Sequence, residues 1–241
     1  MASKNYKSEL DDVFKKFGVF AKASQYRERE KDRISNATRA SINNSVSASS
    51  ASGEKRQELL SDARENADKA AEILLQLHHR LVNDFGRFWR QDLITQDQYG
   101  IPEQEIIEAF SILAILSQKP IPTRTITFRM REPDEYGKTR SSLTVSPEPY
   151  VFGLLDCVGE LDRILHDSLK NNQKEFLKQI LKKMEEMYAK LERFKEFPNR
   201  KDPLIKTKSK TKNLANLKNR IDVCGGQIHR CRTLLQNKGI L

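Results

Sequence analysis

Hydrophobic residues between positions 54 and 82 recur at alternating steps of three and four, with alanine and glutamate filling much of the rest. That spacing places the apolar side chains on one face, so it predicts a long amphipathic helix. Residues 8–42 predict another helix upstream. The residues between the two are rich in Ser, Ala and Asn, which predicts a flexible connection over residues 43–57. The chain thus opens with a helix, a connection and a second helix.

The middle of the chain has a different pattern. Residues 103–116 are far more apolar and predict a shorter helix, with Pro102 in its first turn, where a missing N–H does no harm. Residues 119–145 contain three prolines and the alternating sequence Thr-Ile-Thr-Phe at 125–128. They predict a loop or a short pair of strands rather than a helix.

Three further helices are predicted in the remaining third. A serine, a proline and a glutamate at 146–148 suit a helix start, and that helix continues to position 169. Apolar residues at helical spacing over 176–194 mark the next helix, which Pro198 ends. The last helix covers residues 214–236 and is weakened by two adjacent glycines.

No strand alternates with helices in these patterns, so the sequence predicts an all-α fold. We expect one domain over residues 1–241, built as a bundle of about seven helices. The chain is 37% hydrophobic, which suffices for a helical core. No apolar run approaches the ~20 residues of a membrane span, and the N-terminal residues lack the apolar segment of a secretory signal. These features predict a soluble intracellular chain without a membrane segment.

The positive charge is concentrated in one stretch. The 241 residues include 43 Lys and Arg against 33 Asp and Glu, a net charge of +10. Residues 170–220 alone hold 16 basic and 6 acidic residues, a difference of 10 that accounts for the whole surplus. Such a stretch suits a polyanionic partner, because phosphate contacts release counterions. A well-solvated helix face explains it equally well.

Cysteines and histidines suggest no metal site. The chain has three cysteines, Cys157, Cys224 and Cys231, and they lack CxxC spacing. They therefore predict reduced structural thiols rather than a disulfide framework or a cysteine zinc site. Adjacent His78 and His79 point about 100° apart on a helix and cannot share an ion. We expect no ligand-type neighbours for His166 or for His229.

Two glutamates interrupt the apolar helix over residues 103–116. Glu105 and Glu108 lie on one side of it, while apolar residues occupy the other faces. A covered carboxylate must be paired, protonated or bound to a metal, because an isolated buried charge is costly. The alternative is a pair of ordinary glutamates held by the helix dipole and by lysine or arginine partners.

A second acidic pair lies on the helix over residues 146–169. Asp156 and Glu160 are four residues apart and share a face, and Gly153 and Gly159 flank them. Each glycine weakens a helix by up to ~1 kcal/mol, which suggests close approach of another backbone or a ligand. If the two acidic helices faced each other, four carboxylates would form an oxygen-rich site suited to Mg²⁺ or Mn²⁺. Phosphodiester chemistry is typical of such a site. A solvated polar face is the alternative.

One short segment combines aromatic and basic residues. Arg87 and Arg90 flank a Phe-Trp pair, a combination that can stack bases and hold phosphates. Four residues of this kind also occur by chance. We take the two arginines as candidate RNA contacts.

The second acidic helix resembles the signature helix of the translin superfamily. The similarity lies in Val-Ser-Pro at 145–147, in Tyr150 and Gly153, and in Gly-Glu-Leu at 159–161. Within this superfamily the sequence is similar to the Trax branch, the translin-associated factor X proteins. Their patterns Asp-x-x-Gly-Glu-Leu and Glu-x-x-Glu-Ala both have counterparts here, at 156–161 and 105–109. Translin itself has an apolar residue in place of the aspartate and lacks the earlier acids.

The resemblance implies a seven-helix subunit that joins translin subunits in a closed hetero-octamer. It also implies a Mg²⁺-dependent endoribonuclease, with Mn²⁺ as a substitute ion, that cleaves single-stranded RNA such as passenger strands in RNA silencing or tRNA processing fragments. The ion would be held, and the reaction carried, by the four matched acids: Glu105, Glu108, Asp156 and Glu160. Relatives of this type occur in the cytoplasm, the nucleus or both.

Two other functions fit parts of the sequence. One is a non-catalytic scaffold subunit that binds single-stranded RNA or single-stranded DNA, as translin does. The other is a helical adaptor whose basic stretch binds an acidic protein. Neither explains why both acidic pairs are present, so the nuclease is the preferred hypothesis.

Overall fold

The computed structural model describes residues 2–85, 101–133, 137–169, 173–199 and 208–241. Six α-helices dominate this part of the chain: α1 (Ala2–Ser50), α2 (Gly53–Phe85), α3 (Ile101–Leu116), α4 (Pro147–Ser168), α5 (Lys174–Leu191) and α6 (Lys208–Asn237). A 3₁₀ helix, η3 (Glu192–Asn199), continues α5. The predicted all-α class and order of helices are confirmed.

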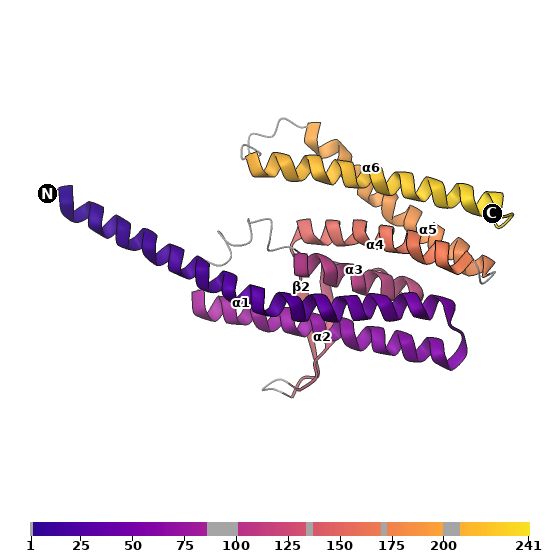
Figure 1. Ribbon diagram of the computed structural model, residues 1–241, viewed down its shortest axis with the longest axis horizontal. Helices are drawn as coiled ribbons and strands as arrows, with labels where there is room; N and C mark the ends of the chain where they lie inside the picture. Colours follow the sequence, from indigo (N-terminus) through magenta and orange to yellow (C-terminus); the bar gives the residue numbers. More distant parts are fainter. Residues whose placement is uncertain (1, 86–100, 134–136, 170–172, 200–207) are drawn as a thin grey trace.

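The helices are arranged in three layers (Figure 1). α1 and α2 form an antiparallel pair, α3 and α4 lie next to it, and α5 and α6 form the outer layer. α3 contacts both helices of the first pair, and α4 contacts both helices of the outer pair. The α3–α4 layer, which carries all four predicted acids, is therefore the middle of the molecule. The N-terminal part of α1 extends beyond the bundle (Figure 1).

The flexible connection predicted over residues 43–57 is wrong. α1 continues to Ser50 and α2 begins at Gly53, so two residues link them. Small residues of this segment, Ser45, Ala48 and Ser49, are buried, and Ser49 Oγ lies 3.4 Å from Ser168 Oγ of α4. The hydroxyl of Ser49 finds a partner within the helix, since Ser49 Oγ donates to the carbonyl of Val46 at 2.6 Å. Tertiary packing here outweighs the weak helix propensity of serine.

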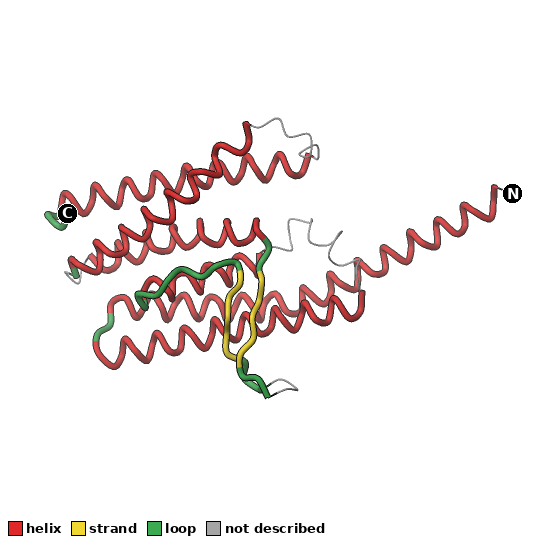
Figure 2. The backbone as a smooth tube through the Cα atoms, turned by 180° about the vertical axis from the view of Figure 1, so that it is seen from behind, coloured by secondary structure: helices red, strands yellow, loops and turns green. Residues whose placement is uncertain are grey.

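The segment 119–145 is a strand pair within a longer connection, so the second of the two alternatives is the correct one. β1 (Thr125–Arg129) pairs antiparallel with β2 (Arg140–Thr144), with Ile126 opposite Leu143. Figure 2 shows the pair crossing the helices on one side of the bundle. Its apolar residues point inward because successive strand side chains alternate between faces: Ile126, Phe128 and Leu143 are buried.

Two hydrophobic clusters hold the layers together. One joins α1, α2, α3 and the strand pair, and it includes the predicted stripe of α2, of which Ala67, Leu74 and Leu81 are buried. The other joins α3 to α4, α5 and α6 through residues such as Ile112 and Leu161. α3 contributes to both clusters, which explains why it is apolar on nearly all faces. None of the helices in the described ranges is both long enough and apolar enough to cross a membrane.

Candidate functional site

The two acidic helices face each other, and Gly153 marks the contact. A Cβ atom at Gly153 would lie 2.6 Å from the backbone oxygen of Gln104 and 2.8 Å from Cβ of Ile107. The close backbone approach predicted for this glycine is therefore confirmed. Gly159 differs, because a Cβ there would meet only Nε2 of Gln227, at 3.7 Å. The contact at Gly153 places the acidic positions of α3 and α4 beside one another.

Glu105 is held by hydroxyl groups of α1. Ser35 Oγ donates to Glu105 Oε2 at 2.7 Å, and Thr38 Oγ1 donates to the same oxygen at 3.1 Å. Hydrogen bonds to an ionised carboxylate are stronger than those between neutral groups. The lysine or arginine partners expected for an ordinary surface glutamate are replaced here by two neutral donors, which fix the carboxylate without neutralising its charge.

Glu108 lies in an environment that disfavours a charged carboxylate. Burial, together with the negative charges of Glu160 and Glu105, raises the pKa of its carboxyl to about 7, against the opposing effect of Arg220 and Arg163. No side chain in the described part of the chain donates a hydrogen bond to Glu108. A half-buried carboxylate beside two others, without a donor, is an environment that a cation would stabilise.

Asp156 has two protein partners from other helices. Arg220 of α6 forms an ion pair with its Oδ1, and Gln104 of α3 donates to its Oδ2. The guanidinium of Arg220 also lies 4.9 Å from the centroid of the Phe152 ring. Burial lowers the pKa of Arg220. Arg220 thus brings one positive charge, fixed by stacking, to the edge of the acidic cluster.

Glu160 completes the set, one helical turn beyond Asp156. Arg163 Nε donates to its Oε1 at 2.8 Å from the next turn of α4. Arg163 is largely exposed, whereas Glu160 is mostly covered. The carboxylate of Glu160 remains close enough to Glu108 for the two charges to repel.

The structure brings three of the predicted acids together and connects the fourth indirectly. Glu105, Glu108 and Glu160 interact electrostatically, and Asp156 joins them through Arg220, which acts on Glu108 as well. Within the described ranges, no three of the four acids have carboxylate oxygens that all lie within 4.8 Å of one another. The donor set is all oxygen, which fits Mg²⁺ or Mn²⁺. The repulsion at Glu108, which Arg220 and Arg163 relieve only in part, also fits a bound cation, so the residues present suit such an ion.

Comparison with known proteins agrees with this fold. The Translin family model matches residues 22–233, most of the chain. The chain belongs to the translin family. No curated protein matches this translin-family chain.

Three solved structures are similar to it. The crystal structure of AfC3PO is 19% identical over 97% of this chain and 94% of that one, with a TM-score of 0.50. A structure of AfC3PO with duplex RNA is 18% identical over 98% and 100% of the two chains, with a TM-score of 0.43. The crystal structure of apo-NeC3PO is 17% identical over 92% and 96%, with a TM-score of 0.46. At these identities the likeness concerns the fold.

Two residues were not predicted from the sequence: Glu103, a buried acid on the same helix as Glu105 and Glu108, and Arg220, which belongs to this translin-family site. Glu103 is buried, which raises the pKa of its carboxyl to about 7, and it lies 3.6 Å from Nε2 of His78. Its position one residue after Pro102, in the first turn of an apolar helix, is a signal that could have identified it. Arg220 gave no such signal, because it lies 64 positions from Asp156 and only the packing of α6 on α4 brings them together.

The predicted RNA contacts cannot be placed in the family fold. Arg87 and Arg90 lie outside the described residues. The basic stretch is described in part, and some of its charge is neutralised locally. Lys183 pairs with Glu186 at 2.6 Å, and Lys195 pairs with Asp222 at 2.8 Å.

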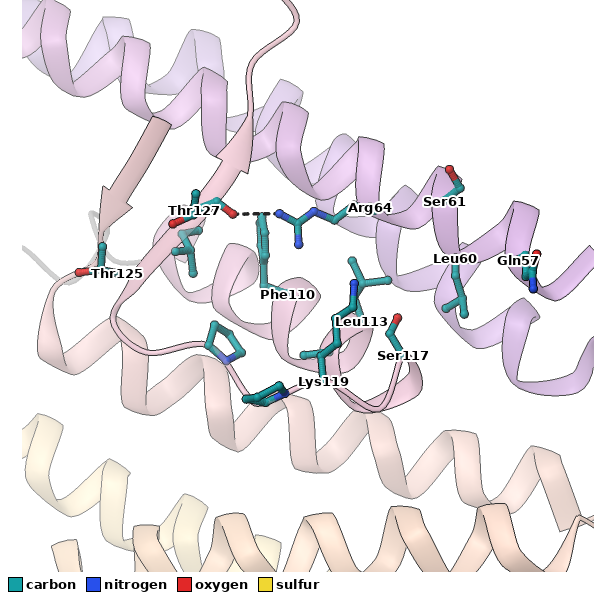
Figure 3. Close-up of a pocket in the computed structure, with 14 residues that line it drawn as sticks. Gln57, Leu60, Ser61, Arg64, Phe110, Leu113, Ser117, Lys119, Thr125 and Thr127 are labelled. Carbon is teal, nitrogen blue, oxygen red and sulfur yellow. Dashed lines mark hydrogen bonds between the residues drawn. The ribbon is translucent and has the colours of Figure 1, made fainter. Parts of the chain in front are cut away.

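A pocket of about 550 Å³ lies apart from the acids, between α2, α3, β1 and the segment that leads into β1. Figure 3 shows Arg64 reaching across it, with its guanidinium donating to the carbonyl of Thr127 at 2.9 Å. The same guanidinium lies 4.9 Å from the centroid of the Phe110 ring. None of the four predicted acids lines this pocket, so it forms no part of the candidate metal site.

Proposed function

We propose that this chain is a Trax-type, Mg²⁺-dependent endoribonuclease subunit that cleaves single-stranded RNA. It would act within a hetero-oligomer with translin subunits, on substrates such as passenger-strand or tRNA processing fragments. The observation that carries the proposal is the environment of Glu108. This carboxyl group is half-buried between Glu105 and Glu160, and burial and the two neighbouring carboxylates raise its pKa despite Arg220 and Arg163. A subunit that served only as a scaffold would gain no stability from such an arrangement.

The four acids would hold the ion, each from a position fixed by other parts of the chain. Hydroxyls of α1 orient Glu105, whereas Gln104 and Arg220 orient Asp156. Bound Mg²⁺ would activate a water molecule and stabilise the charge that develops on the scissile phosphate. Mn²⁺ offers similar oxygen coordination and would substitute for it.

Arg220 and Arg163 would supply the positive charge that the RNA backbone needs. Both guanidinium groups act on the acidic cluster, and Arg163 is exposed enough to meet a phosphate. Arg87 and Arg90 remain candidate RNA contacts on the evidence of the sequence. The basic surplus over residues 170–220 favours a polyanion in general, and we expect RNA affinity to fall with salt concentration.

The test is cleavage of labelled single-stranded RNA by this chain purified with its translin partner. We expect cleavage with Mg²⁺ or Mn²⁺ and none with EDTA. Glu105→Gln, Glu108→Gln and Asp156→Asn should each abolish it, whereas the exposed acid variant Asp167→Asn on the same helix α4 should not. Size-exclusion chromatography checks that every variant assembles.

The alternative function is a non-catalytic subunit that binds single-stranded RNA or DNA. One observation favours it: Asp156 and Glu160 already have arginine partners, as structural acids do. Binding without cleavage in all samples, metal included, would establish this function and refute the nuclease. The compartment, cytoplasm or nucleus, stays an expectation from the resemblance.

A further inference from the structure

A second cluster of side chains that can bind a metal lies between α4 and α6, and its donor atoms differ from those of the four acids. Asp162, His166 and Cys231 place one ligand atom each within 4.8 Å of the others. Asp162 and His166 are four residues apart, so they share a face of α4. Cys231 comes from α6, 69 positions after Asp162. The expectation that His166 lacks ligand-type neighbours is therefore wrong, because only the packing of α6 on α4 completes the group.

The three side chains already contact one another through Asp162. The Cys231 thiol donates to Asp162 Oδ1 at 2.8 Å, and His166 Nε2 lies 3.4 Å from the same oxygen. Cys231 is fully buried, whereas 51% of the His166 side chain is exposed. The cluster therefore has a buried sulfur end and an open imidazole end, and solvent can reach it from the surface.

The donor set distinguishes this cluster from the acidic one. A thiolate, an imidazole and a carboxylate suit Zn²⁺, whereas Mg²⁺ takes oxygen ligands only. Tetrahedral zinc bonds of about 2.0–2.3 Å separate neighbouring ligand atoms by about 3.3–3.7 Å. The separation of His166 and Asp162 matches that range. The carboxylate of Asp162 would move away from the sulfur by less than ~1 Å, since a Zn–S bond replaces the S–H···O contact.

We propose that Asp162, His166 and Cys231 form a Zn²⁺ site that ties α4 to α6. The three side chains occupy three coordination positions, and water takes the fourth at the exposed end. On binding, the Cys231 sulfur bonds to the ion and its proton is released to the solvent. Burial and the hydrogen bond to Asp162 raise the pKa of the Cys231 thiol to about 12, against the smaller opposing effect of Arg230. The ion itself would therefore displace the proton, since a coordinating thiol is deprotonated by the metal.

The test uses Co²⁺ as a spectroscopic probe for Zn²⁺, with the purified full-length chain and its partner subunits. Excess Mg²⁺ fills oxygen-only sites. We expect one equivalent of Co²⁺ to produce a thiolate-to-cobalt charge-transfer band, which Zn²⁺ then abolishes by displacement. Cys231→Ser should lack the band, and Cys224→Ser, a buried cysteine of the same helix, should keep it.

A second variant keeps the test decisive if the buried Cys231→Ser substitution impairs folding. His166→Ala removes an exposed side chain, and it should weaken Co²⁺ binding at least about tenfold, since even outer-shell changes weaken metal sites by about that much. Zn²⁺ should raise the melting temperature of wild type and of Asp167→Asn, but not of His166→Ala. No thiolate band in wild type, or equal affinity in His166→Ala, would overturn the proposal and leave a hydrogen-bonded trio without a metal.

Discussion

The contact at Gly153 gives a direct test of how the two acidic helices are held together. Gly153→Ala would place a Cβ atom 2.6 Å from the Gln104 backbone oxygen and 2.8 Å from Ile107 Cβ. Both atoms belong to α3 and lie on or next to its backbone, so rotation of a side chain cannot relieve the clash. The helices would have to separate by roughly 1 Å to restore ordinary contact distances.

The expected cost follows from two opposing effects. Alanine favours a helix over glycine by about 1 kcal/mol, while overpacking a close contact costs about 1–3 kcal/mol. Because backbone is involved, we take the upper end, so Gly153→Ala should lower the free energy of unfolding by about 2 kcal/mol. Gly159→Ala on the same helix meets only Gln227 Nε2, at 3.7 Å. The Gly159→Ala variant should benefit from the higher helix propensity of alanine, and its free energy of unfolding should rise by up to about 1 kcal/mol.

Thermal denaturation followed by circular dichroism, at one protein concentration, measures the difference. A kcal/mol corresponds to about 2–4 °C for a chain of this size, so the two variants should melt about 6–12 °C apart in opposite directions from wild type. Equal or higher stability of Gly153→Ala would mean that α3 and α4 are not in contact there. The arrangement of the acids would then be wrong as well.

Three further outcomes can be checked by the same method. Burial raises the pKa of Glu103 from an ordinary 4.5 to about 7, and the pKa of Glu108 is raised to about 7 as well, so wild-type stability should fall as pH rises from 4.5 to 7. Glu103→Gln should remove only the part of that fall due to Glu103, a gain over wild type of at most about 3 kcal/mol above pH 7 and nothing below pH 4.5; parallel pH curves of the two proteins would contradict this. Ser35→Ala deletes the 2.7 Å hydrogen bond to Glu105 and should cost about 1.5 kcal/mol, with no change in stability as the opposing result. A Cβ atom at Gly226 would meet nothing closer than 3.6 Å, so Gly226→Ala should raise the free energy of unfolding by up to about 1 kcal/mol. A Cβ atom at Gly225 would lie 2.6 Å from the Tyr188 hydroxyl of α5, so Gly225→Ala should not stabilise the protein. The reverse order of stability would refute the packing of α5 on α6.

Local patterns predicted the helices well where one face is apolar and the other polar. The stripe of α2 and the nearly complete burial of α3 follow from spacing and composition, because a helix must cover its apolar faces. The same reasoning failed over residues 43–50, where small serines form a close helix contact instead of a loop. Serine has no apolar signal, so only the neighbouring helix reveals its role.

The sequence indicated the acids of the candidate site, but it did not indicate which residues surround them. Spacing placed Glu105 and Glu108 on one face, and a glycine hinted at the close approach of α3 and α4. The partners come from distant segments: Ser35 and Thr38 from α1, and Arg220 from α6. No local pattern encodes such contacts, since they arise only when the layers pack. Cys231 beside Asp162 was missed for the same reason.

We propose that the acids between α3 and α4 form the catalytic centre of a ribonuclease. It is tested most directly by the rate at which the assembled complex cleaves labelled single-stranded RNA in Mg²⁺, with Glu108→Gln measured beside Asp167→Asn. We expect a loss of at least about 100-fold for Glu108→Gln with assembly and RNA binding intact, and a wild-type rate for Asp167→Asn. Equal rates for the two variants, or no cleavage by wild type in any metal, would contradict it.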